Sequence, residues 1–222
     1  MSRKLISVHF PKAAGTSLAS AYAAALGADR VLRDYGEDPV DPCALINLHP
    51  FRYEETKPTS LGLFTAVHGH FHIRRYDRIS DAVRVVVLRE PVDNLISIYY
   101  FWDALRRGRQ YSGHSLYKYF CESQLGLIDL ATIPALRKLM SGVYFRDVDM
   151  GCFDVIGNFQ YLDGYLRRVS DLIGLELGFL PKLNVAPPSD ERTAVSEDPR
   201  TLARLRDLLA DDLRFYERYC VR

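Results

Sequence analysis

A short segment near the start of the chain carries residue types that bind phosphate. It reads PKAAGTS at residues 11–17, between an apolar run and an alanine-rich stretch. Lys12 offers a mobile positive charge, Gly15 allows close approach of the backbone, and Thr16 and Ser17 offer hydroxyl groups. Backbone N–H groups and the dipole at the start of a helix also attract anions. The pattern predicts a phosphate-binding loop, although an ordinary turn between a strand and a helix explains the same residues.

The order of residues in this loop differs from that of a nucleotide triphosphatase. There the lysine follows the last glycine, as in GxxxxGK[ST], whereas Lys12 precedes Gly15 by three residues. The aspartate that usually ends an apolar strand and holds Mg²⁺ is also missing, because the most apolar run ends in Arg89. We therefore expect cations to bind an anion directly, with no required metal.

A second anion-binding signal follows the apolar run VRVVVL at residues 83–88. Arg89 stands at its end, and Ser97 lies eight residues further on. Ligands of parallel sheets bind beyond the carboxyl ends of the strands, and a guanidinium holds a phosphate through two parallel hydrogen bonds. The alternative is that Arg89 pairs with an acid such as Asp93 and that Ser97 packs within a helix. Two anion sites at one edge would suit a nucleotide with 5′ and 3′ phosphates.

These residues need a scaffold that brings them to one edge. Alternating strand and helix patterns predict an α/β fold with a central, mainly parallel sheet flanked by helices, in a single domain over residues 1–222. Strands are predicted at 4–10, 61–67, 83–88 and 153–159, and helices at 15–26, 90–104, 132–141, 160–173 and 199–219, the last with Asp198 as its cap. Segments 28–60, apart from one short helix, and 181–198 are predicted to be loops.

Composition excludes several classes of protein. The 222 residues carry 29 Lys and Arg against 28 Asp and Glu, and 48% of them are hydrophobic. This balance excludes a disordered tail and a highly charged nucleic-acid scaffold. No apolar run reaches the roughly 18 residues of a membrane helix, and the apolar run before Pro11 is too short for a secretory signal. Four cysteines without CxxC spacing fit reduced thiols, so we expect a cytoplasmic protein.

Both anion-binding segments resemble the phosphate motifs of sulfotransferases. Residues 9–18 (HFPKAAGTSL) are similar to the 5′-phosphosulfate loop of that family. Residues 89–97 (REPVDNLIS) are similar to its 3′-phosphate motif, including the spacing of eight. Shorter similarities occur in family order, and they resemble most the carbohydrate branch that includes the heparan 2-O- and 6-O-sulfotransferases: HGHF at 68–71, FDVIG at 153–157, LPKLNV at 180–185 and DLRFYE at 212–217.

The resemblance implies a P-loop-like three-layer fold and an activity. The donor would be 3′-phosphoadenosine 5′-phosphosulfate (PAPS), bound without a metal. Its sulfuryl group would move to a hydroxyl of an acceptor, a carbohydrate or glycolipid. The chain departs from the family at Ala13 and Ala14, where relatives often carry Thr-Gly, and at Gln160, where an acidic residue is common. The implied donor-binding residues are Lys12, Ala13, Ala14, Gly15, Thr16, Ser17, Arg89, Ser97 and Asn184.

Sulfuryl transfer needs a base for the acceptor proton, cations for the leaving phosphate and an in-line arrangement. Lys12 matches the leaving-group side by resemblance. Among six histidines, His70 best matches the family's Gly-His-aromatic pattern and is the expected base. His68 is the alternative base or a contact to the acceptor. The HGHFH segment also has metal-ligand residue types, but no further ligand cluster accompanies it in the sequence.

Three arginines follow the second motif in a segment rich in tyrosine, residues 99–119, which also holds Trp102. Aromatic faces stack on sugar rings, and Arg106, Arg107 and Arg109 suit an anionic glycan. A helix that buries its aromatic residues explains the same pattern. Two other functions stay open at this stage, a P-loop kinase of small molecules and a non-catalytic nucleotide-binding module. Binding of 3′,5′-ADP or of ATP with Mg²⁺ would distinguish them.

Overall fold

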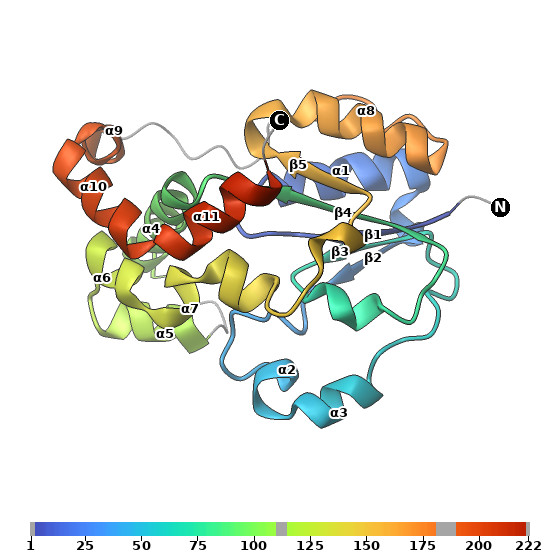
Figure 1. Ribbon diagram of the computed structural model, residues 1–222, viewed down its shortest axis with the longest axis horizontal. Helices are drawn as coiled ribbons and strands as arrows, with labels where there is room; N and C mark the ends of the chain where they lie inside the picture. Colours follow the sequence, from blue (N-terminus) through green and yellow to red (C-terminus); the bar gives the residue numbers. More distant parts are fainter. Residues whose placement is uncertain (1–2, 110–114, 181–189, 221–222) are drawn as a thin grey trace.

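A five-stranded sheet, parallel at every pairing, forms the centre of the protein in a computed structural model that describes residues 3–109, 115–180 and 190–220 (Figure 1). The strand order is β2-β3-β1-β4-β5, with β1 in the middle. Strands β1 and β4 are buried along most of their length, as expected for strands covered on both faces. The strands are β1 (Lys4–Val8), β2 (Val31–Asp34), β3 (Ala66–Gly69), β4 (Ala82–Leu88) and β5 (Val155–Asn158).

Helices cover the sheet and extend beyond one of its edges (Figure 1). Helices α1 (Gly15–Leu26) and α8 (Leu162–Ile173) lie side by side on one face, where the hydroxyls of Tyr22 and Tyr165 are 2.9 Å apart. Helices α2 (Leu45–Leu48) and α3 (Pro50–Glu55) lie on the other side. The predicted P-loop-like α/β fold is confirmed, with a sheet that is parallel throughout the described residues.

A group of helices gathers at the carboxyl ends of the strands (Figure 1). Its members are α4 (Pro91–Arg107), α5 (Ser115–Glu122), α6 (Leu127–Thr132), α7 (Pro134–Arg137), α9 (Asp190–Glu197), α10 (Pro199–Leu208) and α11 (Ala210–Tyr219). Short 3₁₀ turns lie at η1 (Ala28–Arg30), η2 (Ile73–Tyr76), η4 (Met150–Cys152) and η5 (Phe159–Tyr161), and η3 (Leu139–Tyr144) is a π-helix. These elements enclose the edge at which ligands of parallel sheets bind.

Two predicted helix starts are confirmed by their caps. The Glu90 carboxylate accepts a hydrogen bond from the Asp93 N–H at 2.7 Å, and Pro91 occupies the first turn of α4. The Asp198 carboxylate accepts from the N–H groups of the residues that begin α10. Both caps satisfy backbone donors that have no partner within the helix.

Several predicted boundaries are wrong. Strand β2 lies inside the predicted loop 28–60, because an edge strand reading VLRD is partly exposed and lacks an apolar pattern. The predicted strand 61–67 begins instead at Ala66, since Gly62 has a φ of 55° and a turn joins Phe64 N–H to the Leu61 carbonyl. The predicted loop 181–198 contains α9. The predicted helices 132–141 and 199–219 are interrupted, the first by π-helix η3 and the second at Leu209.

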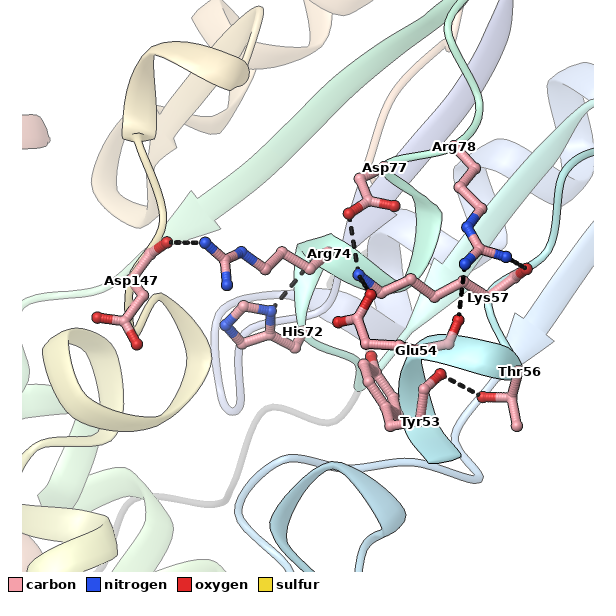
Figure 2. Close-up of polar contacts among 9 residues, drawn as sticks. All are labelled: Tyr53, Glu54, Thr56, Lys57, His72, Arg74, Asp77, Arg78 and Asp147. Carbon is pink, nitrogen blue, oxygen red and sulfur yellow. Dashed lines mark hydrogen bonds and ion pairs between the residues drawn. The ribbon is translucent and has the colours of Figure 1, made fainter. Parts of the chain in front are cut away.

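Polar contacts hold turn η2 against the segment that follows the π-helix (Figure 2). The His72 Nε2–H donates to the carbonyl of Arg146 at 3.0 Å, and Nη2 of Arg74 donates to the carbonyl of Asp147 at 2.8 Å. Nδ1 of His72 accepts from the backbone N–H of Arg74. The neutral ring of His72 therefore has a hydrogen-bond partner at both nitrogens, as a donor at Nε2 and an acceptor at Nδ1.

The opposite side of the same turn is fixed to α3 (Figure 2). The ammonium of Lys57, whose side chain is only 3% exposed, contacts Asp77 at 2.9 Å and Glu54 at 2.8 Å. Arg78 donates to the carbonyls of Glu54 and Lys57, and Arg75 pairs with Asp34 at 2.6 Å. Arg74 and Arg78 are exposed and Arg75 is half-buried, and all three link this turn to its neighbours.

The burial of His72 makes stability depend on pH. Burial lowers the pKa of His72 to about 4, whereas a histidine in the unfolded chain titrates near 6.5. Between these values the unfolded chain binds the proton and the folded one does not. The free energy of unfolding should therefore fall as the pH drops from about 6.5 to about 4, by up to roughly 1.4 kcal/mol per pH unit. Urea unfolding at several pH values measures this slope. In His72→Gln the slope should be smaller, because one proton fewer is taken up on unfolding.

The control for this experiment is His49→Gln, because His49 is exposed. It should leave the slope unchanged. An equal slope in His72→Gln and the wild type would show that His72 does not contribute to the pH dependence of stability.

Candidate active site

Side chains that follow each of the strands meet at the carboxyl edge of the sheet. Lys12 follows β1, Asp38 follows β2 and His70 follows β3, while Arg89 and Phe159 come directly after β4 and β5. Parallel strands end on the same side, so the fold brings these residues to one edge. The predicted residues Lys12, His70 and Arg89 thus lie at this edge. Asn184 lies outside the described residues.

The loop between β1 and α1 is strained and is held by the start of α4. Lys12 and Ala14 have φ values of 59° and 62°, a left-handed conformation that costs a residue with a side chain about 1–2 kcal/mol. Nη1 of Arg89 donates to the Lys12 carbonyl at 3.0 Å, and Nδ2 of Asn94 donates to the Pro11 carbonyl at 2.7 Å. The two sequence motifs are therefore joined directly, and these bonds help to fix the loop.

The ammonium of Lys12 lies among other cations. Its Nζ is 4.0 Å from the centre of the Phe101 ring. Burial lowers the pKa of Lys12 to about 8, and the charges of Arg89 and Arg192 add to this effect. Arg192 comes from α9, inside a segment predicted to be loop, and it belongs to neither of the two phosphate motifs. The positive charges of such a cluster repel one another, and a bound anion would offset this repulsion.

Arg89 has protein partners on several sides. Its Nε contacts the carboxylate of Asp93 at 2.9 Å, and its guanidinium lies 4.4 Å from the centre of the Phe159 ring. The pairing of Arg89 with Asp93, considered as the alternative at the sequence level, is present. Ser97 is buried within α4. These contacts hold the guanidinium at the strand end in one orientation.

The start of α1 packs tightly against two histidines. A Cβ atom on Gly15 would lie 1.8 to 2.2 Å from atoms of the His9 ring, so only glycine fits there. The Gly15 carbonyl accepts from Nε2–H of His68 at 3.0 Å, and Nδ1 of His68 is 2.9 Å from the Ser7 hydroxyl. His68 is fully buried, and burial lowers its pKa to about 3. The expectation that His68 is an alternative base or an acceptor contact disagrees with this geometry, because both ring nitrogens are already used.

His70 has a different environment at the same edge. Its Nδ1 is 2.7 Å from Oδ2 of Asp38, while Oδ1 of Asp38 accepts from the Tyr144 hydroxyl at 2.8 Å and from Val40 N–H at 3.1 Å. Nε2 of His70 is buried and has no hydrogen-bond partner among the residues that the structure describes. Such an atom is uncommon in folded proteins and indicates a place where a ligand can bind.

Two aromatic rings pack beside His70. The His9 ring lies 4.3 Å from it and the Tyr35 ring 5.1 Å, both edge-on. Tyr35 is 42% exposed. Sequence reasoning missed Asp38 and Tyr144, since neither belongs to a motif and they are 106 residues apart.

In the aromatic segment 99–119, which begins within α4, the tryptophan is packed against other rings. Trp102 packs against the rings of Tyr117 and Phe120, with centroids 5.7 and 5.6 Å away. Arg106 and Arg107 both pair with Asp103, which is buried, and Arg107 also contacts Glu191 of α9. Arg106 is mostly buried and also donates to the Leu125 carbonyl, whereas the side chain of Arg107 is 65% exposed.

The residues that the structure describes contain neither a cluster of metal-ligand side chains nor a helix that could span a membrane. Among the described residues, no three His, Cys, Asp or Glu side chains are grouped as a metal ion would require. The four cysteines do not form disulfides. Within the same residues, none of the helices combines the length and the apolar character needed to cross a membrane.

Comparisons with known proteins show a similarity of fold to solved structures. No protein-family model matches the chain, and no curated protein matches it. Among solved structures, the chain is similar to a crystal structure of a sulfotransferase from Alicyclobacillus acidocaldarius, with 17% sequence identity and a TM-score of 0.40. The match covers 98% of this chain and 100% of the other. A similarity of this size leaves the function to be argued from the site itself.

The contact between Gly15 and His9 yields a prediction. Gly15→Ala should displace the His9 ring, lower the free energy of unfolding by about 1–3 kcal/mol and weaken anion binding at the loop. Urea unfolding and calorimetry with 3′,5′-ADP measure both effects.

Gly164→Ala is the matched control, since a Cβ at this position in α8 would have no atom within 4 Å. It should be neutral or stabilise the helix by up to about 1 kcal/mol. Equal behaviour of the two variants would show that the loop tolerates the added methyl group.

Proposed function

We propose that this protein is a sulfotransferase that uses PAPS and transfers the sulfuryl group to a hydroxyl of a carbohydrate or glycolipid. One observation supports this most. Lys12 and Arg89 stand at the carboxyl ends of the adjacent central strands β1 and β4, and Nη1 of Arg89 is bonded to the Lys12 carbonyl. Two cations held in this way suit a ligand with two separate phosphate groups.

The loop residues fit a bound phosphosulfate. The start of α1 has no side-chain cap, because Ala14 occupies the cap position. The lowered pKa of Lys12 reflects burial beside other cations, so an anion there would stabilise its charged form. The segment Lys12, Ala13, Ala14, Gly15, Thr16 and Ser17 would hold the 5′ end of the donor. Lys12 would also stabilise the charge that develops on the leaving phosphate.

Arg89 would hold the 3′ phosphate. Its Nε is used by Asp93 and its Nη1 by the Lys12 carbonyl, so the phosphate would meet Nη2. By resemblance, Ser97 and Asn184 would add contacts to the same group. When bound, PAPS would supply the sulfuryl group and would leave as 3′,5′-ADP.

His70 would act as the general base at Nε2. The acceptor hydroxyl gives its proton to this nitrogen while its oxygen bonds to sulfur, and the bond from sulfur to the 5′-phosphate oxygen breaks in line. The exposed ring of Tyr35 lies beside His70, and the exposed ring of Phe101 lies beside Lys12. Aromatic faces of this kind stack on sugar rings, which favours a carbohydrate acceptor.

Binding of 3′,5′-ADP tests the donor site. Calorimetry should show binding that needs no metal and little or no binding of ATP with Mg²⁺. Arg89→Ala should weaken 3′,5′-ADP binding by about 10- to 150-fold, the loss of roughly 1.5–3 kcal/mol for a charge-assisted pair. It should weaken 5′-AMP binding less, because that ligand has no 3′ phosphate and loses only what the bond from Arg89 to the Lys12 carbonyl contributes to the loop. The control Arg52→Ala, on the exposed surface of α3, should change neither.

Other results of this calorimetry would contradict the proposal. Equal losses for both ligands in Arg89→Ala would assign Arg89 to the scaffold. Preference for ATP with Mg²⁺ would favour a kinase.

Removal of the base tests the catalytic role. His70→Ala should bind 3′,5′-ADP with near wild-type affinity and should transfer sulfuryl groups about 10²–10⁴ times more slowly. The assay uses labelled PAPS with a panel of oligosaccharides and glycolipids. The exposed His49→Ala serves as the control and should keep its rate. A His70→Ala variant with a near-normal rate would place the base elsewhere.

A further inference from the structure

We infer that Asp38 is a positioning residue that sets the tautomer of His70, with the hydrogen on Nδ1 and the lone pair on Nε2. This inference concerns the base of the proposed sulfuryl transfer and rests on that function for its catalytic consequence. The tautomer itself is a property of the resting protein and can be measured without any substrate.

The contacts of Asp38 define the tautomer. Burial opposes the charge of this carboxylate, but hydrogen bonds from His70, Val40 N–H and Tyr144 outweigh it and lower the pKa of Asp38. An ionised carboxylate only accepts hydrogen bonds. Nδ1 of His70, 2.7 Å from Oδ2, must therefore carry a hydrogen. In the neutral ring the lone pair then lies on Nε2, the buried atom without a partner. A substrate hydroxyl supplies the donor that this lone pair lacks.

The partner that holds Asp38 is itself fixed by distant parts of the chain. Tyr144 is the last residue of π-helix η3, and the buried carboxylate of Asp212 in α11 accepts from the N–H groups of Met140 and Ser141 at 2.8 and 2.9 Å. The segment after Tyr144 is tied to turn η2, which follows His70, by the bond from His72 to the Arg146 carbonyl. The bond from Arg74 to the Asp147 carbonyl joins the same two segments (Figure 2). His70 and Tyr144 are thus held in place relative to each other.

Asp38→Asn tests the inference because the amide can take only one orientation there. The Val40 N–H is a donor without acceptor capacity, so the amide oxygen must stay at the position of Oδ1. The NH₂ group then faces Nδ1 of His70 and donates to it. The hydrogen of the imidazole must move to Nε2, which can no longer accept a proton from a hydroxyl. The change keeps the size of the side chain.

The tautomer is read by ¹⁵N NMR of the histidine side chains at alkaline pH, where imidazole is neutral, with His70→Gln to assign the signals. In the wild type, Nδ1 of His70 should carry the hydrogen. In Asp38→Asn, Nε2 should carry it, and sulfuryl transfer from labelled PAPS should fall by about 10²–10⁴ while 3′,5′-ADP affinity stays within about twofold. Tyr144→Phe should keep the wild-type tautomer, because the Asp38 carboxylate remains.

The matched control is Asp41→Asn, in the same loop, whose carboxylate contacts Ser115 and Cys43 N–H. It should change neither the tautomer nor the rate. A hydrogen on Nε2 of His70 in the wild type would overturn the inference. So would an unchanged tautomer in a folded Asp38→Asn. If Asp38→Asn shows the reversed tautomer but the wild-type protein transfers no sulfuryl group, the positioning role is supported and the proposed function is rejected.

Discussion

The bonds from Arg89 and Asn94 to the carbonyls of Lys12 and Pro11 are the contacts on which the rest of the site depends. They connect the loop after β1 with the start of α4, across two adjacent parallel strands. The loop has two left-handed residues with side chains, a conformation that persists only where surrounding contacts impose it. The bond from Arg89 also holds its guanidinium beside the loop. The position of Arg89 and the conformation of the loop that carries Lys12 therefore depend on each other.

Three histidines at this edge show how surroundings divide the roles of one residue type. The rings of His68, His9 and His70 lie in contact, with centroid distances of 5.1 and 4.3 Å. His68 is fully buried with both nitrogens used, and it supports the start of α1. His9 packs on Gly15 and lies 3.2 Å from the Tyr35 hydroxyl. His70 instead faces a carboxylate through one nitrogen and lacks a partner at the other, the arrangement required of a base.

Parts of the chain far from the two motifs complete the site. Tyr144 reaches Asp38 from a π-helix, an element that is rare and often found at functional sites. Arg192 adds positive charge near Lys12 from α9. Both come from the helices gathered beyond the carboxyl edge in Figure 1. That group of helices therefore does more than cover the sheet, because it sets the charge and the hydrogen bonding of the residues at its edge.

The sequence by itself determined the elements whose signals are local. Continuous apolar runs predicted β1 and β4, Glu90 and Asp198 marked helix starts, and Lys12 and Arg89 were found because each directly follows a strand or lies in a short motif. Only the tertiary structure decided that Asp38 contacts both His70 and Tyr144 and that both ring nitrogens of His68 have partners. Those facts depend on contacts between residues tens to more than a hundred positions apart, and such contacts leave no period or spacing in the sequence. Burial, which separates His68 from His70, is likewise a property of the packed fold and not of the residue type.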